Sequence, residues 1–220
     1  FVWLKGKSTL MEEFYMVDGP AQGEIVEKKS RFIANVFPVD SEEQALEIIE
    51  KTKKQYWDAR HNCFAFIIGK NNEVQRFSDD GEPQGTAGKP ILEVLTKGNI
   101  HNTLIIVTRY FGGTLLGTGG LVRAYGQSSK AAIEKSRLLR VCEGVSFSVE
   151  CDYNSIGKIK YIIAQMNIEA KEEYGANVKL DIEMPKENFE KFKGQVVEAT
   201  NGQAVFSRVD DIEYKQKCTD

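Results

Sequence analysis

The run NTLIIVTRYF, residues 102–111, is the feature that most restricts the fold of this chain. Its apolar residues do not alternate with polar ones, which is typical of a strand buried on both faces of a sheet. A glycine-rich segment follows, with five glycines among the nine positions from Gly112 to Gly120, and then a helical pattern begins. We therefore expect an α+β domain that buries this strand.

The composition, with 41% hydrophobic and 28% charged residues, is ordinary for a soluble globular protein. The longest aliphatic run, residues 104–107, is far shorter than the roughly 20 residues that cross a bilayer. No secretory signal is visible, so we expect a cytoplasmic protein with no membrane partner. Because Met11 opens a natural-looking start, residues 1–10 are expected to be an upstream or non-native extension.

Periodicity predicts the other elements of a first domain over residues 11–138. A strand pair, or one bent strand, is expected in residues 23–39. A helix that starts with an Asp40/Ser41 cap should follow, and then a hairpin within residues 61–78. The predicted helices also include one that ends at Gly98. A final helix of about 18 residues from Gly120 has an expected packing face. That face consists of Leu121, Tyr125, Ser128 and Ala132.

The rest of the chain predicts a second domain over residues 143–213, with a boundary near residues 138–143. Its expected order is strand 145–151, helix 155–166, strands 168–174 and 177–184, helix 186–200 and strand 203–209. This βαββαβ order is the ferredoxin-like arrangement. The fold class is therefore α+β with two domains.

The second domain is net acidic. Phe189, Phe192 and Phe206 occupy core-like positions in it, while Phe147 and Tyr174 are candidates for exposure. We therefore expect this domain to dock or position a protein, and not to stack RNA bases on its sheet.

Basic charge gathers around the glycine-rich segment, since residues 97–142 hold seven Lys and Arg residues and one acid. The segment matches neither the dinucleotide fingerprint, because Val122 stands where glycine is needed, nor the P-loop. A helix start still directs free N–H groups at an anion, and Arg109 and Arg123 could close around it. The alternative is that these glycines only provide positive φ angles.

Two other clusters admit both a chemical and a structural interpretation. Asp79, Asp80 and Glu82 could hold Mg²⁺, or could pair with Arg76 or Arg109 to join two loops. His61 and Cys63 share one face of an extended strand at a separation too large for a direct hydrogen bond. A core-facing Cys63 and a His61 bonded to a nearby loop are therefore favoured over a nucleophile. No C-x-x-C pair indicates a zinc or iron–sulfur site.

Several motifs in one order resemble the YigZ/IMPACT family, bacterial two-domain type. They are EIVEKKSRFIA, WDARHNCFAFIIG, SDDGEPQGTAG, the stretch from GKPILEV to RYFGGTLLG, and LVRAYG. The resemblance implies a ribosomal protein S5 domain 2-like first domain, similar to a domain of translocation factor EF-G, and a ferredoxin-like, EF-G domain-like second domain. Eukaryotic members regulate a translation-initiation kinase, which a bacterial chain would not meet. The resemblance therefore implies only that this protein acts close to translation.

The leading hypothesis is a non-enzymatic, translation-associated regulatory protein that binds RNA or the ribosome, with no cofactor. The alternatives are a nucleotide- or phosphate-binding enzyme that uses the glycine-rich segment, with Mg²⁺ at Asp79 and Asp80, and a pure protein-interaction module. Neither a specific partner nor an oligomeric state follows from the sequence. The predicted anion-binding residues are Arg76, Arg109, Gly112, Gly113, Gly117, Gly119, Gly120, Arg123, Lys130 and Arg137.

Overall fold

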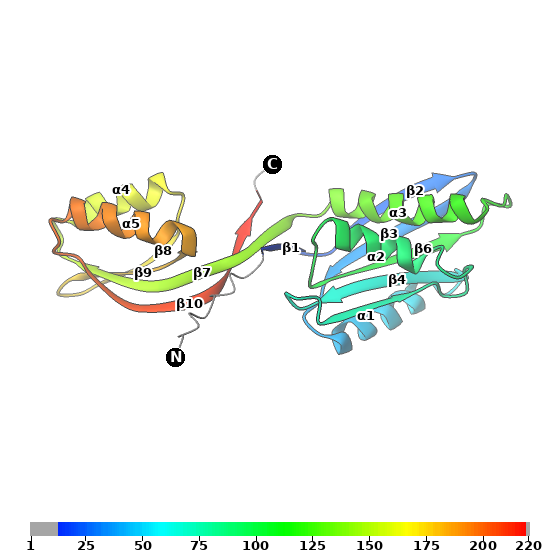
Figure 1. Ribbon diagram of the computed structural model, residues 1–220, viewed down its shortest axis with the longest axis horizontal. Coiled ribbons are helices and arrows are strands. Elements are labelled where there is room, and N and C mark those ends of the chain that lie inside the picture. The colour runs from blue at the N-terminus through cyan, green and yellow to red at the C-terminus, as the bar shows by residue number, and fades with distance from the viewer. Residues whose placement is uncertain (1–12, 219–220) are drawn as a thin grey trace, which may run out of the picture. The chain divides into compact units, whose positions relative to one another are not determined.

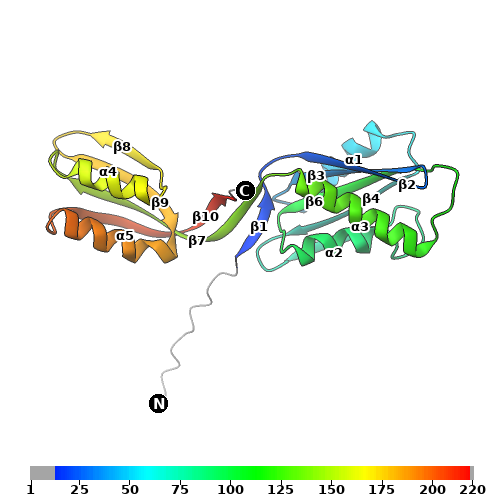
Figure 2. The same ribbon diagram turned by 90° about the horizontal axis from the view of Figure 1, so that it is seen from above.

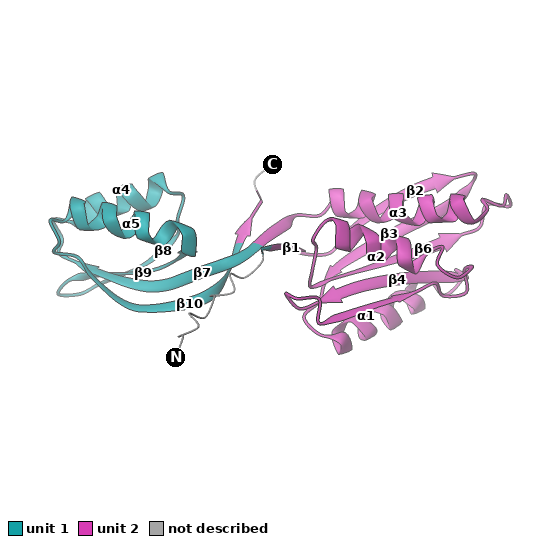
Figure 3. Cartoon of the chain, in the orientation of Figure 1, with its two compact units in different colours: residues 1–13, 141–215 teal, residues 14–140, 216–220 magenta. Residues whose placement is uncertain are grey.

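The computed structural model describes residues 13–218, which form two compact units (Figure 3). The N-terminal unit holds residues 14–140 and 216–218, and the C-terminal unit holds residues 13 and 141–215. The extension expected in residues 1–10 lies outside the described part. Within residues 13–218, no helix is both long enough and apolar enough to span a membrane.

The N-terminal unit is built on a five-stranded sheet with the order β2-β3-β6-β4-β5, and all its pairings are antiparallel. The strand predicted to be buried on both faces, β6, is the central one. The elements are β1 (Phe14–Val17), β2 (Ala21–Glu27), β3 (Ser30–Pro38), α1 (Glu42–Gln55), β4 (His61–Ile68), β5 (Val74–Ser78), α2 (Gly88–Lys97), β6 (Thr103–Tyr110) and α3 (Thr118–Glu134).

Helices cover both faces of this sheet, as Figures 1 and 2 show from two directions. Helix α1 packs on one face over a cluster that includes Ile49, Phe66 and Leu104. Helices α2 and α3 cover the opposite face over a larger cluster that includes Phe32 and Tyr125. Burial of alternate β6 side chains on both faces stabilises the unit, because each buried large apolar side chain contributes about 1.5–3 kcal/mol.

Local sequence signals explain the helix boundaries. Ser41 caps α1 by accepting a hydrogen bond from the Gln44 N–H, as predicted. Gly98 follows the last residue of α2. Helix α3 starts at Thr118, and the four residues predicted to form its packing face are all buried. Strand β1 was not predicted, because a four-residue strand carries little periodicity of its own.

The C-terminal unit has the predicted βαββαβ element order. Strand β9 lies between β7 and β8, and β10 pairs with β7. Helices α4 and α5 cover one face of this sheet (Figure 1). The elements are β7 (Leu138–Cys151), α4 (Ile156–Gln165), β8 (Ala170–Tyr174), β9 (Val178–Pro185), α5 (Lys186–Ala199) and β10 (Val205–Lys217).

The core of the C-terminal unit contains an aromatic group beneath α5. Phe189, Phe192 and Phe206 lie within 6.5 Å of one another or of Phe147, measured between ring centroids. Their core positions were predicted. The suggestion that Phe147 is exposed is wrong, since this side chain is 2% exposed and its ring is the centre of the group. Tyr174 is exposed, as suggested.

Candidate functional site

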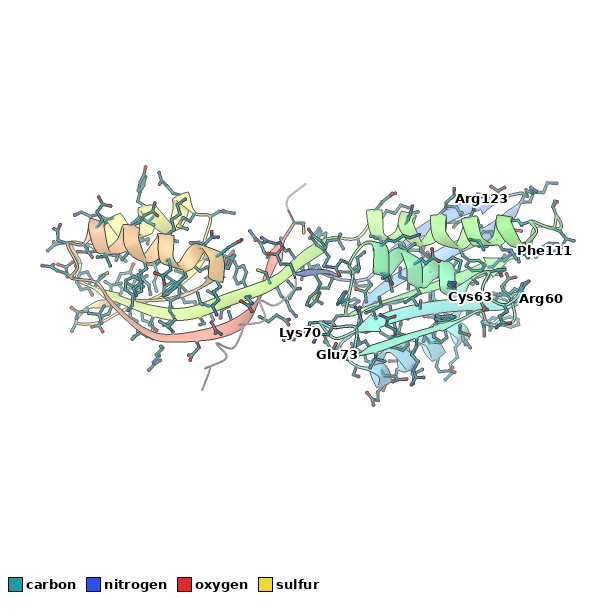
Figure 4. The ribbon with its side chains drawn as sticks, viewed as in Figure 1. Arg60, Cys63, Lys70, Glu73, Phe111 and Arg123 are labelled. Atoms are coloured by element: carbon teal, nitrogen blue, oxygen red, sulfur yellow. The ribbon has the colours of Figure 1, made fainter. Side chains whose placement is uncertain are left out.

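Three connecting segments meet at one end of the N-terminal sheet. His61, the first residue of β4, lies opposite Arg109, near the end of β6. Arg31, near the start of β3, lies opposite Tyr110. The β2–β3 turn, the segment 56–60 before β4 and the segment 111–117 after β6 therefore leave the sheet together. We call segment 111–117 the glycine loop and this end of the unit the glycine-loop end (Figure 4).

The glycine loop is largely exposed and leads directly into α3. Gly113 and Gly117 have φ angles of +85° and +71°, in the region that favours glycine. Gly117 occupies the position before the helix, and no side chain within residues 13–218 caps the first turn. The N–H groups at the start of α3 therefore face outward without a side-chain acceptor, at the positive end of the helix dipole.

Gly112 and Gly120 have a packing role and do not face a ligand. A Cβ atom at Gly112 would lie 2.0 Å from the carbonyl carbon of Lys29, and one at Gly120 would lie 2.9 Å from Cβ of Leu116. The Ser30 Oγ also accepts a hydrogen bond from the Gly112 N–H at 3.1 Å. The start of the glycine loop is thus fixed against the β2–β3 turn.

Arg123 is exposed and lies beside the first turn of α3. A Cβ atom at Gly119 would lie 3.6 Å from Nη1 of Arg123, so the guanidinium group folds back over the start of the helix (Figure 4). A cation near a helix N-terminus is unfavourable by itself, because both carry positive charge. An anion bound between them would relieve this repulsion.

Lys130 and Arg123 both line a groove of about 600 Å³ between α2 and α3. Glu93 and Glu134 line the same groove, so its charge is mixed. Arg137 is not on the face of α3 as predicted, because the helix ends at Glu134 and Arg137 follows in the connection to β7. The predicted cationic stripe of Arg123, Lys130 and Arg137 is therefore reduced to its first two members.

The β2–β3 turn adds two cations that the prediction missed. Lys28 and Lys29 are exposed, and their φ angles of +46° and +67° place both in the left-handed region. A turn of this kind usually contains Asn or Gly, and each non-glycine residue in this region costs about 1–3 kcal/mol. The Lys-Lys pair was visible in the sequence, but its position beside Gly112 required the fold.

Arg109 is not available to an external anion, which corrects the prediction. Its Nη1 donates to Oε1 of Glu82 at 2.6 Å, and the two side chains are only 8% and 3% exposed. The same Glu82 oxygen accepts from the Tyr125 hydroxyl at 2.9 Å. The Arg109 guanidinium also lies 5.5 Å from the ring centroid of Phe32 and 5.6 Å from that of Phe111. The predicted structural alternative, in which this acid joins two loops, is confirmed for Glu82.

Cys63 belongs to the same buried group and not to a catalytic pair. Its Sγ lies 3.3 Å from the Tyr125 Oη and 3.0 Å from the carbonyl oxygen of Asp79. Burial raises the pKa of the Cys63 thiol well above its usual range, which disfavours the reactive thiolate. His61 instead lies 2.9 Å through Nδ1 from the carbonyl oxygen of Asp80. The favoured structural interpretation of these two residues is confirmed.

The segment 79–87, called here the acidic loop, uses Asp79 to cap α2 from within the chain. Its carboxylate accepts hydrogen bonds from the N–H groups of Gly85, Ala87 and Gly88 at 2.8 to 3.0 Å. Partial burial opposes ionisation, but these three donors outweigh it and hold the pKa of Asp79 below its usual range. The start of α2 therefore already binds an anion.

The remaining predicted residues are paired with other parts of the N-terminal unit. Asp80 pairs with Lys53 at 3.1 Å and accepts from the Asn62 N–H at 2.7 Å. Arg76, on the edge strand β5, pairs with Glu42 of α1 at 2.9 Å. Since α1 covers the face opposite to α3, Arg76 does not belong to the same surface as Arg123.

Comparison with known proteins matches both units to domain families. Residues 28–133 match the Impact N-terminal domain, and residues 149–203 match a domain of unknown function, DUF1949. The IMPACT family member YvyE of Bacillus subtilis is 39% identical over 201 residues, covering 89% of this chain and 90% of that protein.

Two further relatives agree with this assignment. The IMPACT family member YigZ of Escherichia coli is 35% identical, covering 80% of this chain and 87% of its own. A crystal structure described as a hypothetical protein is 32% identical, has a TM-score of 0.58, and covers 91% of this chain and 99% of that chain. Each of these comparisons covers most of both chains, and the chain belongs to the IMPACT family.

Proposed function

We propose that this protein is a translation-associated regulatory protein that binds RNA or the ribosome through the glycine-loop end of its N-terminal unit. The observation that carries the proposal is the exposed start of α3, which has outward N–H groups, no side-chain cap and Arg123 folded beside it. Such a helix start binds phosphate through its N–H groups and its dipole.

The charge of the neighbouring side chains supports a phosphate ligand. Lys28, Lys29, Arg60 and Arg123 are exposed, and within residues 13–218 none of these four forms an ion pair. Four cations without an ion pair at one end of the unit give a local positive potential, which attracts a polyanion and accelerates its association.

The relation to translation comes from the family resemblance, and the finer fold assignment belongs to the same proposal. The βαββαβ order, with β7 and β9 inside the sheet, supports a ferredoxin-like C-terminal domain. We likewise assign the N-terminal unit to the S5 domain 2-like folds. Both assignments relate the chain to domains of EF-G, a protein that acts on the ribosome.

The test is sedimentation with bacterial ribosomes, together with the salt dependence of binding to a structured RNA. We expect sedimentation at low salt and release at high salt. Arg123→Ala should lower the slope of log affinity against log salt by about one. Arg76→Ala is the matched control, because it removes the same charge from the α1 side and should leave the slope unchanged.

An unchanged slope and affinity for Arg123→Ala would remove this surface from the proposal. Sedimentation that persists after nuclease treatment of a lysate and at high salt would favour the protein-interaction alternative. Equal losses in Arg123→Ala and Arg76→Ala would show that only net charge matters and that no site exists at α3.

A further inference from the structure

Two aromatic rings are exposed at the glycine-loop end. Trp57 is 82% exposed and Phe111 is 57% exposed. Trp57 lies in the segment before β4, and Phe111 opens the glycine loop after β6. Because β4 and β6 pair with His61 opposite Arg109, the two segments leave the sheet at the same end. Large apolar side chains exposed at one end of a unit are typical of a binding surface.

A hydrogen bond fixes the segments that carry the two rings. The Tyr110 hydroxyl donates to Oδ1 of Asp58 at 2.8 Å. Asp58 directly follows Trp57, and Tyr110 directly precedes Phe111. The Phe111 ring lies on the Arg109 side of the sheet, 5.6 Å from that guanidinium group, while Tyr110 reaches toward the end of α1. Both rings therefore extend from the same end of the sheet, on segments that this hydrogen bond joins.

Cations without acidic partners surround the rings. Lys29 contacts the glycine loop through Gly112, and Lys28 precedes it in the same turn. Arg60 lies three residues after Trp57, and Figure 4 shows Arg60 and Phe111 at the same end of the unit. Of the exposed acids nearby, Asp58 accepts from the Tyr110 hydroxyl, and Glu27 precedes Lys28, so the two lysines and Arg60 outnumber the one acid that has no side-chain partner within residues 13–218. Aromatic rings can stack bases, and nearby cations can contact phosphates, so this combination suits a nucleic acid strand.

We propose that the glycine-loop end recognises single-stranded RNA, whose unpaired bases stack on Trp57 and Phe111 while its phosphates contact Lys28, Lys29 and Arg60. This rests on the proposed function and adds the class of RNA to it. In a duplex, base faces are covered by neighbouring pairs, so stacking on these rings requires unpaired bases. Phosphate contacts alone would not discriminate between single and double strands in this way.

The fluorescence of Trp57 can report stacking of a base on its ring. The chain has two tryptophans, so the Trp3→Phe variant leaves Trp57 as the only one. The probes are an oligouridylate, its duplex with oligoadenylate, and an abasic strand of equal length. We expect oligouridylate to quench Trp57 fluorescence and to bind more tightly than either other probe.

Variants separate stacking from phosphate contact. Trp57→Ala and Phe111→Ala should each weaken oligouridylate binding by about tenfold and leave the weaker binding of the abasic strand unchanged. Phe77→Ala is the matched control, because Phe77 is a 50% exposed ring on β5, and this variant should bind like the parent. Both ring variants are at exposed positions, so loss of folding is not expected, and circular dichroism checks it.

The outcomes distinguish the two proposals. If the abasic strand binds as tightly as oligouridylate and Trp57 fluorescence does not change, stacking is wrong and phosphate binding stands. If no probe binds at low salt, both proposals fail. If the ring variants bind oligouridylate normally but lose a nuclease-resistant protein partner, the rings dock a protein and the inference is overturned.

Discussion

The acidic loop and the glycine loop of the N-terminal unit both lead into a helix, and they treat the helix start in opposite ways. The acidic loop places the Asp79 carboxylate on the first N–H groups of α2 and buries Glu82 against Arg109. The glycine loop supplies no acceptor to α3 and leaves Arg123 beside it. The N–H groups at the start of α2 are bound by a carboxylate of the chain itself, whereas those at the start of α3 are open to an external anion.

The difference shows that a carboxylate or an arginine near a glycine-rich loop does not by itself indicate a site. Arg109 and Arg123 were predicted to act together on one ligand. Arg109 is committed to a buried network with Glu82 and Tyr125, whereas Arg123 is exposed. Partners already present within the fold decide which of two similar groups remains available.

Removing Glu82 should have the largest effect on stability. Glu82→Ala leaves the Arg109 charge buried without its partner, which should lower the free energy of unfolding by about 4 kcal/mol. The measurement is equilibrium unfolding in urea. Glu93→Ala is the control, because its pair with Lys97 is exposed and should contribute less than about 1 kcal/mol. Equal effects of the two variants would refute the structural role of the acidic loop.

Removing the internal cap of α2 should have a smaller effect that depends on pH. Asp79→Ala leaves three N–H donors unsatisfied, which should cost about 2 kcal/mol at neutral pH. The pKa of Asp79 is lowered in the folded state, so its contribution is present above the unfolded value near 3.8. It is lost as pH falls through the folded value.

Unfolding measured at pH 7 and at about pH 3 checks this sign. The difference in stability between parent and Asp79→Ala should shrink at the lower pH. A difference that stays constant would mean that the ionised carboxylate is not what stabilises the start of α2.

A carboxylate placed at the start of α3 should have the smallest effect on stability. Thr118→Asp places a carboxylate at the exposed first position of α3, which should stabilise the protein by about 0.5 kcal/mol. The same charge should weaken RNA binding, because it competes with phosphate at this position. Thr118→Asn, of equal size and without charge, is the control and should bind like the parent. Thermal unfolding and an RNA titration measure both effects, and unimpaired RNA binding by Thr118→Asp would exclude the helix start as a contact.

Periodicity and local signals were sufficient for most of the fold. The buried strand β6, the Ser41 cap and the packing face of α3 all depend on residues close in sequence. Strands β7 and β10 extend further than predicted, since β7 starts at Leu138 and β10 runs to Lys217. The additional β7 residues, 138–144, do not show the alternation that marks a half-buried strand, and the additional β10 residues show it only at Ile212 and Tyr214.

The candidate site could be predicted only in part, because its contacts join distant parts of the chain. Pairing of Glu82 with Arg109 was one of two interpretations of the acidic cluster, and the burial of Glu82 depends on Arg109 and Tyr125, 27 and 43 positions away. Gly112 looked like part of an anion cradle, although the structure uses it to approach Lys29. Arg123 was predicted correctly as an exposed cation because it lies opposite the apolar face of α3.

The fixing of Gly112 against the β2–β3 turn also bears on the thermodynamics of any binding event. One end of the glycine loop is anchored to the sheet and the other continues into α3, so only residues 113–117 can be newly ordered by a ligand. Fixing a residue costs about 1–2 kcal/mol in backbone entropy. We therefore expect the backbone-entropy cost of binding to be confined to this short segment, and a loop that adapts to irregular ligands without moving the sheet beneath it.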